Sequence, residues 1–318
     1  MPDIDSPLAT PHEVQVAGSP QPGQPLVERE FTIVERSQWQ QASRRFFRHK
    51  VAVVSLVVFI LLMLFAFVLP YFWQYKYNAK LPTNDLNAHP SWKHPFGTDN
   101  LGFDQFAFVM RGTAQSMKIA MSIAVLATVG GSIWGVTSGF FGGVVDSALM
   151  RLADLVLTIP SLALAAALAH NFGGTWYVIA FVLGGLAMPY VARVVRGVVL
   201  SLREREFVEA ARALGASNSR LMFRHLLPNA VAVLIVNATL LIAGGILAET
   251  ALSFFGFGVR PPDTSLGLLT FNGQGAIETR PWLFYFPGLF IILIALTVNF
   301  IGDGLRDALD PRQTRQRR

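Results

Sequence analysis

The sequence of 318 residues contains no cysteine and few charged residues. The lack of cysteine excludes disulfides, thiolate metal sites and thiol nucleophiles. Charged residues make up 14% of the chain and hydrophobic residues 52%, whereas soluble domains are roughly 25% charged. Long stretches therefore hold no charge, which is the pattern of a membrane protein.

The chain also lacks a nucleotide-binding lysine motif. Each lysine lacks a preceding glycine, so no P-loop of the form Gly-x-x-x-x-Gly-Lys-Ser/Thr is present. No Ser/His/Asp order, nucleophile elbow or paired carboxylates on one helix stand out. We therefore expect a protein that is not an enzyme and that needs no cofactor. Energy for active work must come from a partner or an ion gradient.

Residues 1–40 form a separate region, rich in proline, glycine, serine and charge. Such a segment cannot bury enough apolar surface to offset its ordering entropy, so we predict a disordered cytoplasmic tail. It does not resemble a cleaved signal peptide, because the first long apolar run starts near Val51 and is too long.

Six segments hold the roughly 20 mostly apolar residues that a membrane span needs. The second contains several glycines, which allow close helix packing in lipid. Pro160 and Pro189 fall inside the third and fourth, where we expect kinks. The sequence thus predicts an all-α polytopic membrane protein with six transmembrane helices. The segments are about 51–73, 117–140, 148–169, 176–199, 230–255 and 283–302.

The basic residues gather before the first segment, between the fourth and fifth, and after the sixth. The alternate loops 74–116, 170–175 and 256–282 hold fewer. The positive-inside rule therefore puts both termini, including the basic tail 313–318, and the loop 203–229 in the cytoplasm.

The loop 203–229 is the most informative stretch. Its first half has apolar residues at helical spacing, from Phe207 to Leu214. Gly215 is placed as a helix C-terminal cap, Ser217 or Asn218 can cap a second helix, and Pro228 is expected to end it. The sequence predicts a helical hairpin with a small-residue corner.

Three interpretations of this hairpin compete. A helix-turn-helix with arginines could read DNA, but membrane segments flank it closely, so no nucleic acid is expected. A plain connector with a solvated charged face is the second interpretation. The third is a docking element that seats in a groove of a cytoplasmic partner.

The hairpin resembles the EAA loop of ABC importer permeases. The similarity lies in Glu209-Ala210-Ala211, then Gly215 after three residues, then Leu227-Pro228. In that family the loop forms the coupling helix that docks on the ATPase subunit. The resemblance implies that Glu209, Ala210 and Gly215 shape the docking corner.

Further motifs extend the resemblance over nearly all of 45–312. Residues 94–104, HPFGTDNLGFD, are similar to the "HPxGTDxxGRD" segment of dipeptide and oligopeptide permeases, although Phe103 replaces its arginine, so no role of that arginine is carried over. Residues 249–262 are similar to "EAxLSFLGLGVxPP", and Phe286–Gly288 and Asn299–Arg312 resemble the last span and tail of the family. These motifs point to the C-type permease subunit.

What the resemblance implies is a type I ABC importer permease fold, over residues 41–312, in the cytoplasmic (inner) membrane. The implied partners are a sister (B-type) permease, two cytoplasmic ATP-binding subunits and an extracytoplasmic substrate-binding protein. The implied function is translocation of di- or oligopeptides by alternating access. Nickel or another small solute is the alternative substrate, because related permeases share these motifs.

Ionisable residues inside spans are functional candidates by default. Lys118 could attract a peptide carboxylate or snorkel to the headgroups, and snorkelling is the simpler account. Asp154 follows Arg151 by one turn, so an ion pair competes with a pathway role. Glu249 is expected to brace the SFFGFG loop that follows it, with ligand contact as the alternative.

Outside the segments, Asp104, Asp263 and Glu278 are expected to be solvated or to contact a binding protein. His89 and His94 are too sparse for a zinc-type cluster, so no metal site is predicted.

Two other functions remain open. An ion-coupled secondary transporter predicts broken helices, buried acids at mid-membrane and an internal repeat, but the acids lie near span ends and no repeat is seen. A membrane scaffold without transport is the third possibility.

Overall fold

The computed structural model describes residues 38–82 and 85–309. Within them the chain is helical, and its β pairing is limited to one bridge between Thr98 and Asp104. The predicted all-α class is confirmed. The expectations for residues 1–37 and 313–318 lie outside the described residues. Helix α1 begins at Gln38, so the expected boundary of the disordered tail at residue 40 was wrong.

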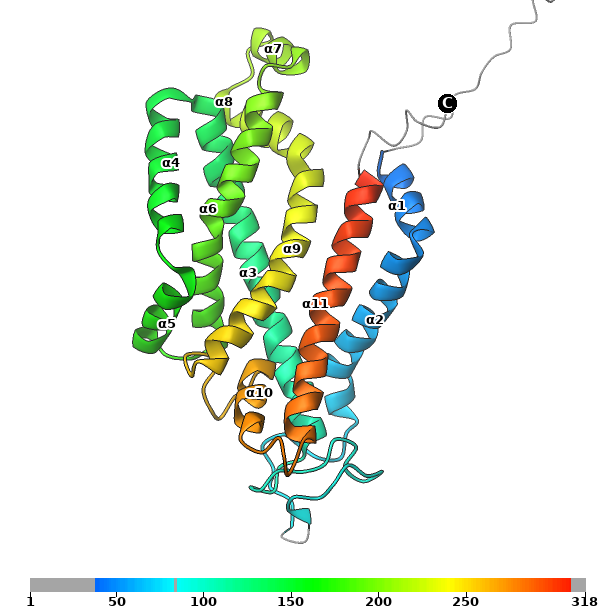
Figure 1. Cartoon of the computed structure of the whole chain (residues 1–318). Coiled ribbons are helices and arrows are strands. Elements are labelled where there is room, and N and C mark those ends of the chain that lie inside the picture. Colours follow the sequence, from blue (N-terminus) through cyan, green and yellow to red (C-terminus); the bar gives the residue numbers. More distant parts are fainter. Residues whose placement is uncertain (1–37, 83–84, 310–318) are drawn as a thin grey trace, which may run out of the picture. The chain divides into compact units, whose positions relative to one another are not determined.

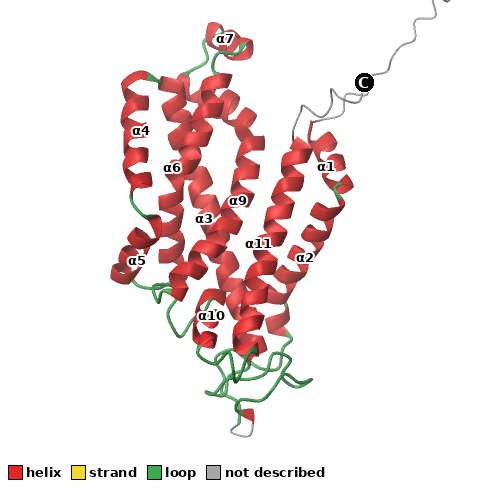
Figure 2. Cartoon of the chain, in the orientation of Figure 1, coloured by secondary structure: helices red, strands yellow, loops and turns green. Residues whose placement is uncertain are grey.

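Figures 1 and 2 show long helices that run side by side, joined by short loops at one end and longer loops at the other. The helices in chain order are α1 (Gln38–Arg48), α2 (Lys50–Phe67), α3 (Gln105–Phe141), α4 (Gly143–Thr158), α5 (Ser161–Phe172), α6 (Trp176–Leu202), α7 (Glu206–Ala213), α8 (Asn218–Arg220), α9 (Leu227–Phe254), α10 (Leu266–Gln274) and α11 (Trp282–Leu309). A 3-10 turn follows α2, and a π-helical segment, Leu221–Leu226, joins α8 to α9.

The two ends of the bundle carry different elements. Helix α7, α1 and the last turns of α11 lie at one end, which we call the hairpin end (Figure 1). Residues 72–82 and 85–104, together with α10, lie at the opposite end, which we call the loop end.

Within residues 38–82 and 85–309, five continuous helical stretches are long and apolar enough to cross a membrane, and a bent pair supplies a sixth span if it is counted as one. This matches the six predicted segments. The continuous stretches are Lys50–Tyr71, Gln105–Phe141, Trp176–Leu202, Asn218–Phe254 and Trp282–Leu309.

The third segment is a broken helix rather than a kinked one. Helices α4 and α5 meet at an angle of 84° around Pro160. Proline disfavours helical backbone in the preceding residue, and Ile159 is extended, with φ −78° and ψ 134°. The segment 148–169 is therefore two short helices, 143–158 and 161–172.

The second span begins at Gln105, well before the predicted residue 117. Its first turns carry Gln105, Arg111 and Gln115, which lowered the apolar signal. Asp104 caps this helix by accepting the Ala107 N–H at 2.8 Å, and such a cap satisfies one of the otherwise unpaired N–H groups.

Helix α3 lies at the centre of the bundle, since its side chains take part in three of the hydrophobic clusters. Its glycines face α6 closely. A Cβ on Gly131 would lie 2.5 Å from the Val191 Cβ and 2.7 Å from the Met188 carbonyl oxygen. The expected use of small residues for close packing is confirmed.

Pro228 was expected to end the second hairpin helix, and this was wrong. It lies in the first turn of α9, and the helical stretch runs on from Asn218 to Phe254. Proline has no N–H to donate, and the residues before it adopt π-helical geometry, a form in which the hydrogen bonds skip one more residue.

Candidate functional site

The hairpin end carries the first candidate site, the hairpin 203–229. Gly215 has φ +82°, a conformation that favours glycine. The Ala216 N–H donates to the Ala211 carbonyl and the Gly215 N–H to the Arg212 carbonyl, both at 3.0 Å, which is the Schellman pattern. Ser217 accepts the Arg220 N–H at 3.4 Å. Both predicted caps are confirmed.

Apolar burial holds the hairpin on the bundle. Val208, Leu221 and Leu226 are at most 1% exposed. They join a cluster with Val136 of α3 and Val199 of α6. The Arg203 Nη1 group donates to the Gly139 carbonyl of α3 at 3.1 Å. The hairpin is therefore fixed to the two central helices.

The outer face of the hairpin is exposed. Leu214 at the corner is 88% exposed and Phe207 39%, and Glu209, Ala210 and Gly215 are exposed with them. The spacing of Phe207 and Leu214 had indicated an apolar face, and that face points outward. Val208, which the sequence analysis did not single out, is the buried anchor.

The other predicted hairpin residues face elsewhere. Ala211 and Leu227 pack against the buried cluster, and Pro228 is exposed at the base. The six predicted residues therefore divide into an outward corner (Glu209, Ala210 and Gly215), two inward supports and one residue at the base.

At the loop end, buried polar groups bond to one another. Asp104 is fully buried. Its carboxylate accepts the His94 ring nitrogen Nδ1 at 2.7 Å and Trp73 Nε1 at 3.3 Å, besides the helix cap. The expectation that Asp104 is solvated was wrong, since this carboxylate ties the loop to the start of α3.

A second polar contact joins α3 to the segment before α10. Arg111 Nε donates to Asp263 Oδ1 at 3.0 Å and Nη2 to Oδ2 at 3.2 Å. The Tyr77 ring lies 5.1 Å from the Arg111 guanidinium carbon. Asp263, also expected to be solvated, is paired.

Glu249 is fully buried on α9. It accepts hydroxyl hydrogen bonds from Ser253 at 2.7 Å and from Ser116 of α3 at 3.0 Å. Ser253 leads into the SFFGFG loop, so the preferred bracing role fits the contacts. The side chain does not line an open path in this chain.

Lys118 and Asp154 also have partners. The Lys118 Nζ atom lies 5.8 Å from the centre of the Phe67 ring, and the residue is half-buried. Asp154 pairs with Arg193 of α6 rather than with Arg151, because the ion pair joins two helices that lie side by side. The expected i,i+3 pair was wrong.

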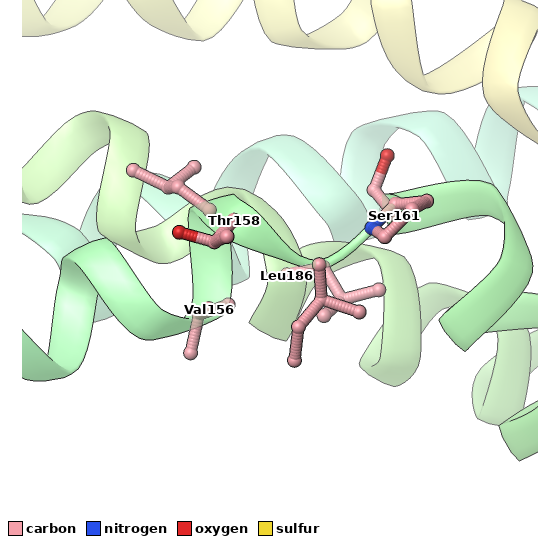
Figure 3. A pocket seen from close by; sticks show the side chains of 7 residues that line it. Val156, Thr158, Ser161 and Leu186 are labelled. Carbon is pink, nitrogen blue, oxygen red and sulfur yellow. The ribbon is translucent and has the colours of Figure 1, made fainter.

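A pocket of about 310 Å³ lies where α4 and α5 meet (Figure 3). Residues 156–161 and Leu186 line it. In these two helices only Ala153, Ala165 and Ala169 are buried, so among the described residues this chain leaves most of their surface uncovered.

Metal binding finds no support in residues 38–82 and 85–309, where no group of three or more His, Asp or Glu is placed to hold an ion. His94 is bonded to Asp104. The His89 ring lies 4.6 Å from the Trp282 ring, centre to centre.

Known proteins match nearly the whole chain. Residues 131–315 match the family described as binding-protein-dependent transport system inner membrane component. Residues 37–90 match the N-terminal TM domain of oligopeptide transport permease C.

Individual relatives are similar to this chain over most of its length. The oligopeptide transport system permease protein OppC of Mycobacterium bovis is 43% identical over 278 residues, 86% of this chain and 95% of the relative. OppC of Haemophilus influenzae is 38% identical over 285 residues, 89% and 91% of the two chains. A putative peptide permease protein of Brucella suis is 41% identical over 275 residues, 86% and 90% of the two chains. The chain therefore belongs to the family of binding-protein-dependent transport system inner membrane components, on the branch of the C-type oligopeptide permeases.

Proposed function

We propose that this chain is the transmembrane permease subunit of an ATP-driven importer that moves peptides across the cytoplasmic membrane. Relatives named as oligopeptide permeases over nearly their whole length support the substrate class. The observation that carries the coupling mechanism is the hairpin, which is anchored through Val208 and exposes its corner at Leu214. Residues 41–312, together with the start of α1, form the permease domain.

The hairpin end faces the cytoplasm in this proposal. The basic residues that precede α2 and those of the hairpin lie at this end (Figure 1), as the positive-inside rule requires. The loop end then meets an extracytoplasmic substrate-binding protein. Each of two ATP-binding subunits receives one hairpin, from this chain or from a sister permease.

A stripe on α9 is proposed as the contact with the sister permease. Val233, Leu240, Leu247 and Phe254 are exposed at every seventh position. Asn237, Gly244 and Ala251 alternate with them. Large and small residues at spacings of three and four form the seam of packed helices, and small residues favour close approach in lipid. The transport path runs along this seam and the uncovered faces of α4 and α5.

The first experiment tests the docking corner. Leu214→Asp places a charge on a side chain that is 88% exposed, so the fold should persist while binding to an apolar groove is lost. We expect the ATP-binding subunits to co-purify at least about tenfold less well, and peptide uptake to fail with them. Trp92→Asp is the matched control for the co-purification measurement alone, because Trp92 is fully exposed in the loop that lies at the opposite end, where the substrate-binding protein is proposed to bind.

Two outcomes would overturn the proposal. One is full ATPase co-purification and uptake with Leu214→Asp. The other is uptake that continues in ATP-depleted cells and stops with an uncoupler, which would identify an ion-coupled transporter. Competition by unlabelled peptide but not by Ni²⁺ would separate the two substrate classes.

A further inference from the structure

The exposed stripe of α2 differs in composition from that of α9. Val51, Val54, Val57, Leu61 and Leu64 are all exposed along one face of α2. Every member is a large aliphatic residue, and no glycine, alanine or serine interrupts the stripe. Helix contacts in membranes favour small residues, so this stripe suits lipid acyl chains rather than a partner helix.

Phe47, in α1, extends the exposed apolar stripe of α2 by one residue. It lies four residues before Val51 and is 66% exposed. Its neighbour Phe46 is buried with Ala52 and Ala308. The Phe46 ring also lies against Gly304 of α11, where a Cβ would approach it to 3.2 Å. Because Phe46 fixes the rotation of α1, Phe47 is held at the point where the apolar stripe ends.

Three exposed cations surround this point: Arg44, Arg48 and Lys50. At about 100° per residue, Arg44 and Arg48 lie one turn apart on the face opposite Phe46. Lys50 begins α2, immediately before its apolar run. The acidic group known to contact this elbow, Asp307 of α11, pairs with His49 at 3.7 Å and so lies on the α11 side.

We propose that the elbow between α1 and α2 is a binding site for an anionic phospholipid. The lipid phosphate contacts Arg44, Arg48 and Lys50, Phe47 lies at the level of the glycerol backbone, and an acyl chain follows the α2 stripe. Cationic side chains beside a span attract anionic lipid, and a basic helix with an apolar face lies at the membrane surface. The proposal does not depend on the transported substrate.

The test uses the full chain, purified in detergent and studied by native mass spectrometry. Phosphatidylglycerol and phosphatidylcholine with identical acyl chains are added in turn. We expect the wild-type chain to retain phosphatidylglycerol in preference. The variant R44Q/R48Q/K50Q should lose about tenfold of that retention, with phosphatidylcholine retention unchanged. Phe47→Ser should weaken the retention of both lipids severalfold, because it removes apolar contact without changing charge.

The matched control is R212Q/R220Q/R224Q, which removes three exposed arginines from the hairpin at the same end. It should keep the preference for phosphatidylglycerol. An equal loss in this control would show general cationic attraction and overturn the site. A wild-type chain without preference, as expected if an acidic protein segment covers the elbow, would overturn it too. So would displacement of the lipid by an equal concentration of glycerol 3-phosphate, which would indicate an anion site without a lipid chain. Unchanged elution on gel filtration verifies that each variant is folded.

Discussion

The hairpin at one end of the bundle and the carboxylates at the other end are held by different contacts. The hairpin is fixed by aliphatic side chains such as Val208 and Leu226, while its corner residues point away from the bundle. At the loop end, the carboxylates of Asp104 and Asp263 are paired with groups of the same chain. An apolar anchor leaves the opposite surface free to bind a partner. Polar groups that bond to one another stabilise the fold instead and are not free to bind a partner.

This difference predicts where substitutions lower the stability of the chain and where they weaken the binding of a partner subunit. Substitution of the buried loop-end carboxylate of Asp104 should destabilise the chain, and hairpin-corner substitutions should leave it folded but unable to bind its partner.

The largest effect is expected from Asp104→Ala. The change removes the cap of α3 and leaves the Trp73 N–H and the His94 ring without their acceptor. Loss of a cap costs about 1 kcal/mol, and each buried group left unpaired about 1–3 kcal/mol. We expect a loss of about 3 kcal/mol or more, measured as a lower melting temperature in detergent. Asp85→Ala is the control, because its ion pair with Lys93 is at the surface, where an ion pair adds little to stability.

The next test compares two hairpin residues. Val208→Ala removes buried methyl groups and should destabilise the chain by about 2 kcal/mol. Leu214→Ala changes a side chain that is 88% exposed and should leave the melting temperature unchanged while weakening ATPase co-purification. If Leu214→Ala were the more destabilising change, the corner would be part of the fold rather than a docking surface.

Much of the hairpin could be predicted from the sequence, because its signals are local. Gly215 and Ser217 act on neighbours within a few residues, and the structure places both as expected. The direction of the hairpin could not be predicted. Phe207 and Leu214 satisfy helical spacing as well as Val208 does, and the packing of α7 against the π-helical segment Leu221–Leu226 and its cluster decides which face is buried.

The loop end was predicted poorly, because its contacts span long distances in sequence. Arg111 and Asp263 are 152 residues apart and Ser116 and Glu249 are 133 apart. A lone polar residue before a span looks solvated unless its partner is known. The position of Asp104, one residue before an uninterrupted helix, was the one local signal available, since Asp is favoured at N-caps.

A smaller effect is expected from Glu249→Gln, which tests whether the carboxyl of Glu249 braces the loop or carries a proton. Glu249→Gln keeps the shape of the side chain but leaves one acceptor oxygen in place of two, so one of the two serine hydroxyls, Ser116 or Ser253, loses its acceptor. We expect a loss of about 1 kcal/mol and uptake within about twofold of the wild type. Uptake in reconstituted vesicles is the measurement, with ATP as the sole energy source. Complete loss of uptake in a folded Glu249→Gln chain would mean that the carboxyl of Glu249 carries a proton during transport.

The smallest effect concerns Asp99, in the loop segment 85–104 that precedes α3. Burial raises the pKa of its carboxyl, although the N–H groups of Phe103 and Leu101 donate to it at 2.7 and 3.0 Å. Folding therefore favours the protonated form. This stabilisation is fully present below the unfolded pKa of about 3.9 and is lost as the pH rises through the folded value.

Asp99→Asn imitates the protonated form and removes that dependence. The melting temperature of the variant relative to the wild type should therefore increase as the pH rises from about 4 to about 7. Asp85→Asn should show the opposite sign, and below about pH 4, because the hydrogen bond from Lys93 lowers the pKa of Asp85. The contribution of Asp85 is therefore present above its unfolded pKa and is lost as the pH falls through the lowered folded value. If the stability of both variants changed with pH in the same direction, the pH dependence would arise from the chain as a whole. The two carboxyl groups of the loop end would then not respond separately, each to its own hydrogen-bond partners.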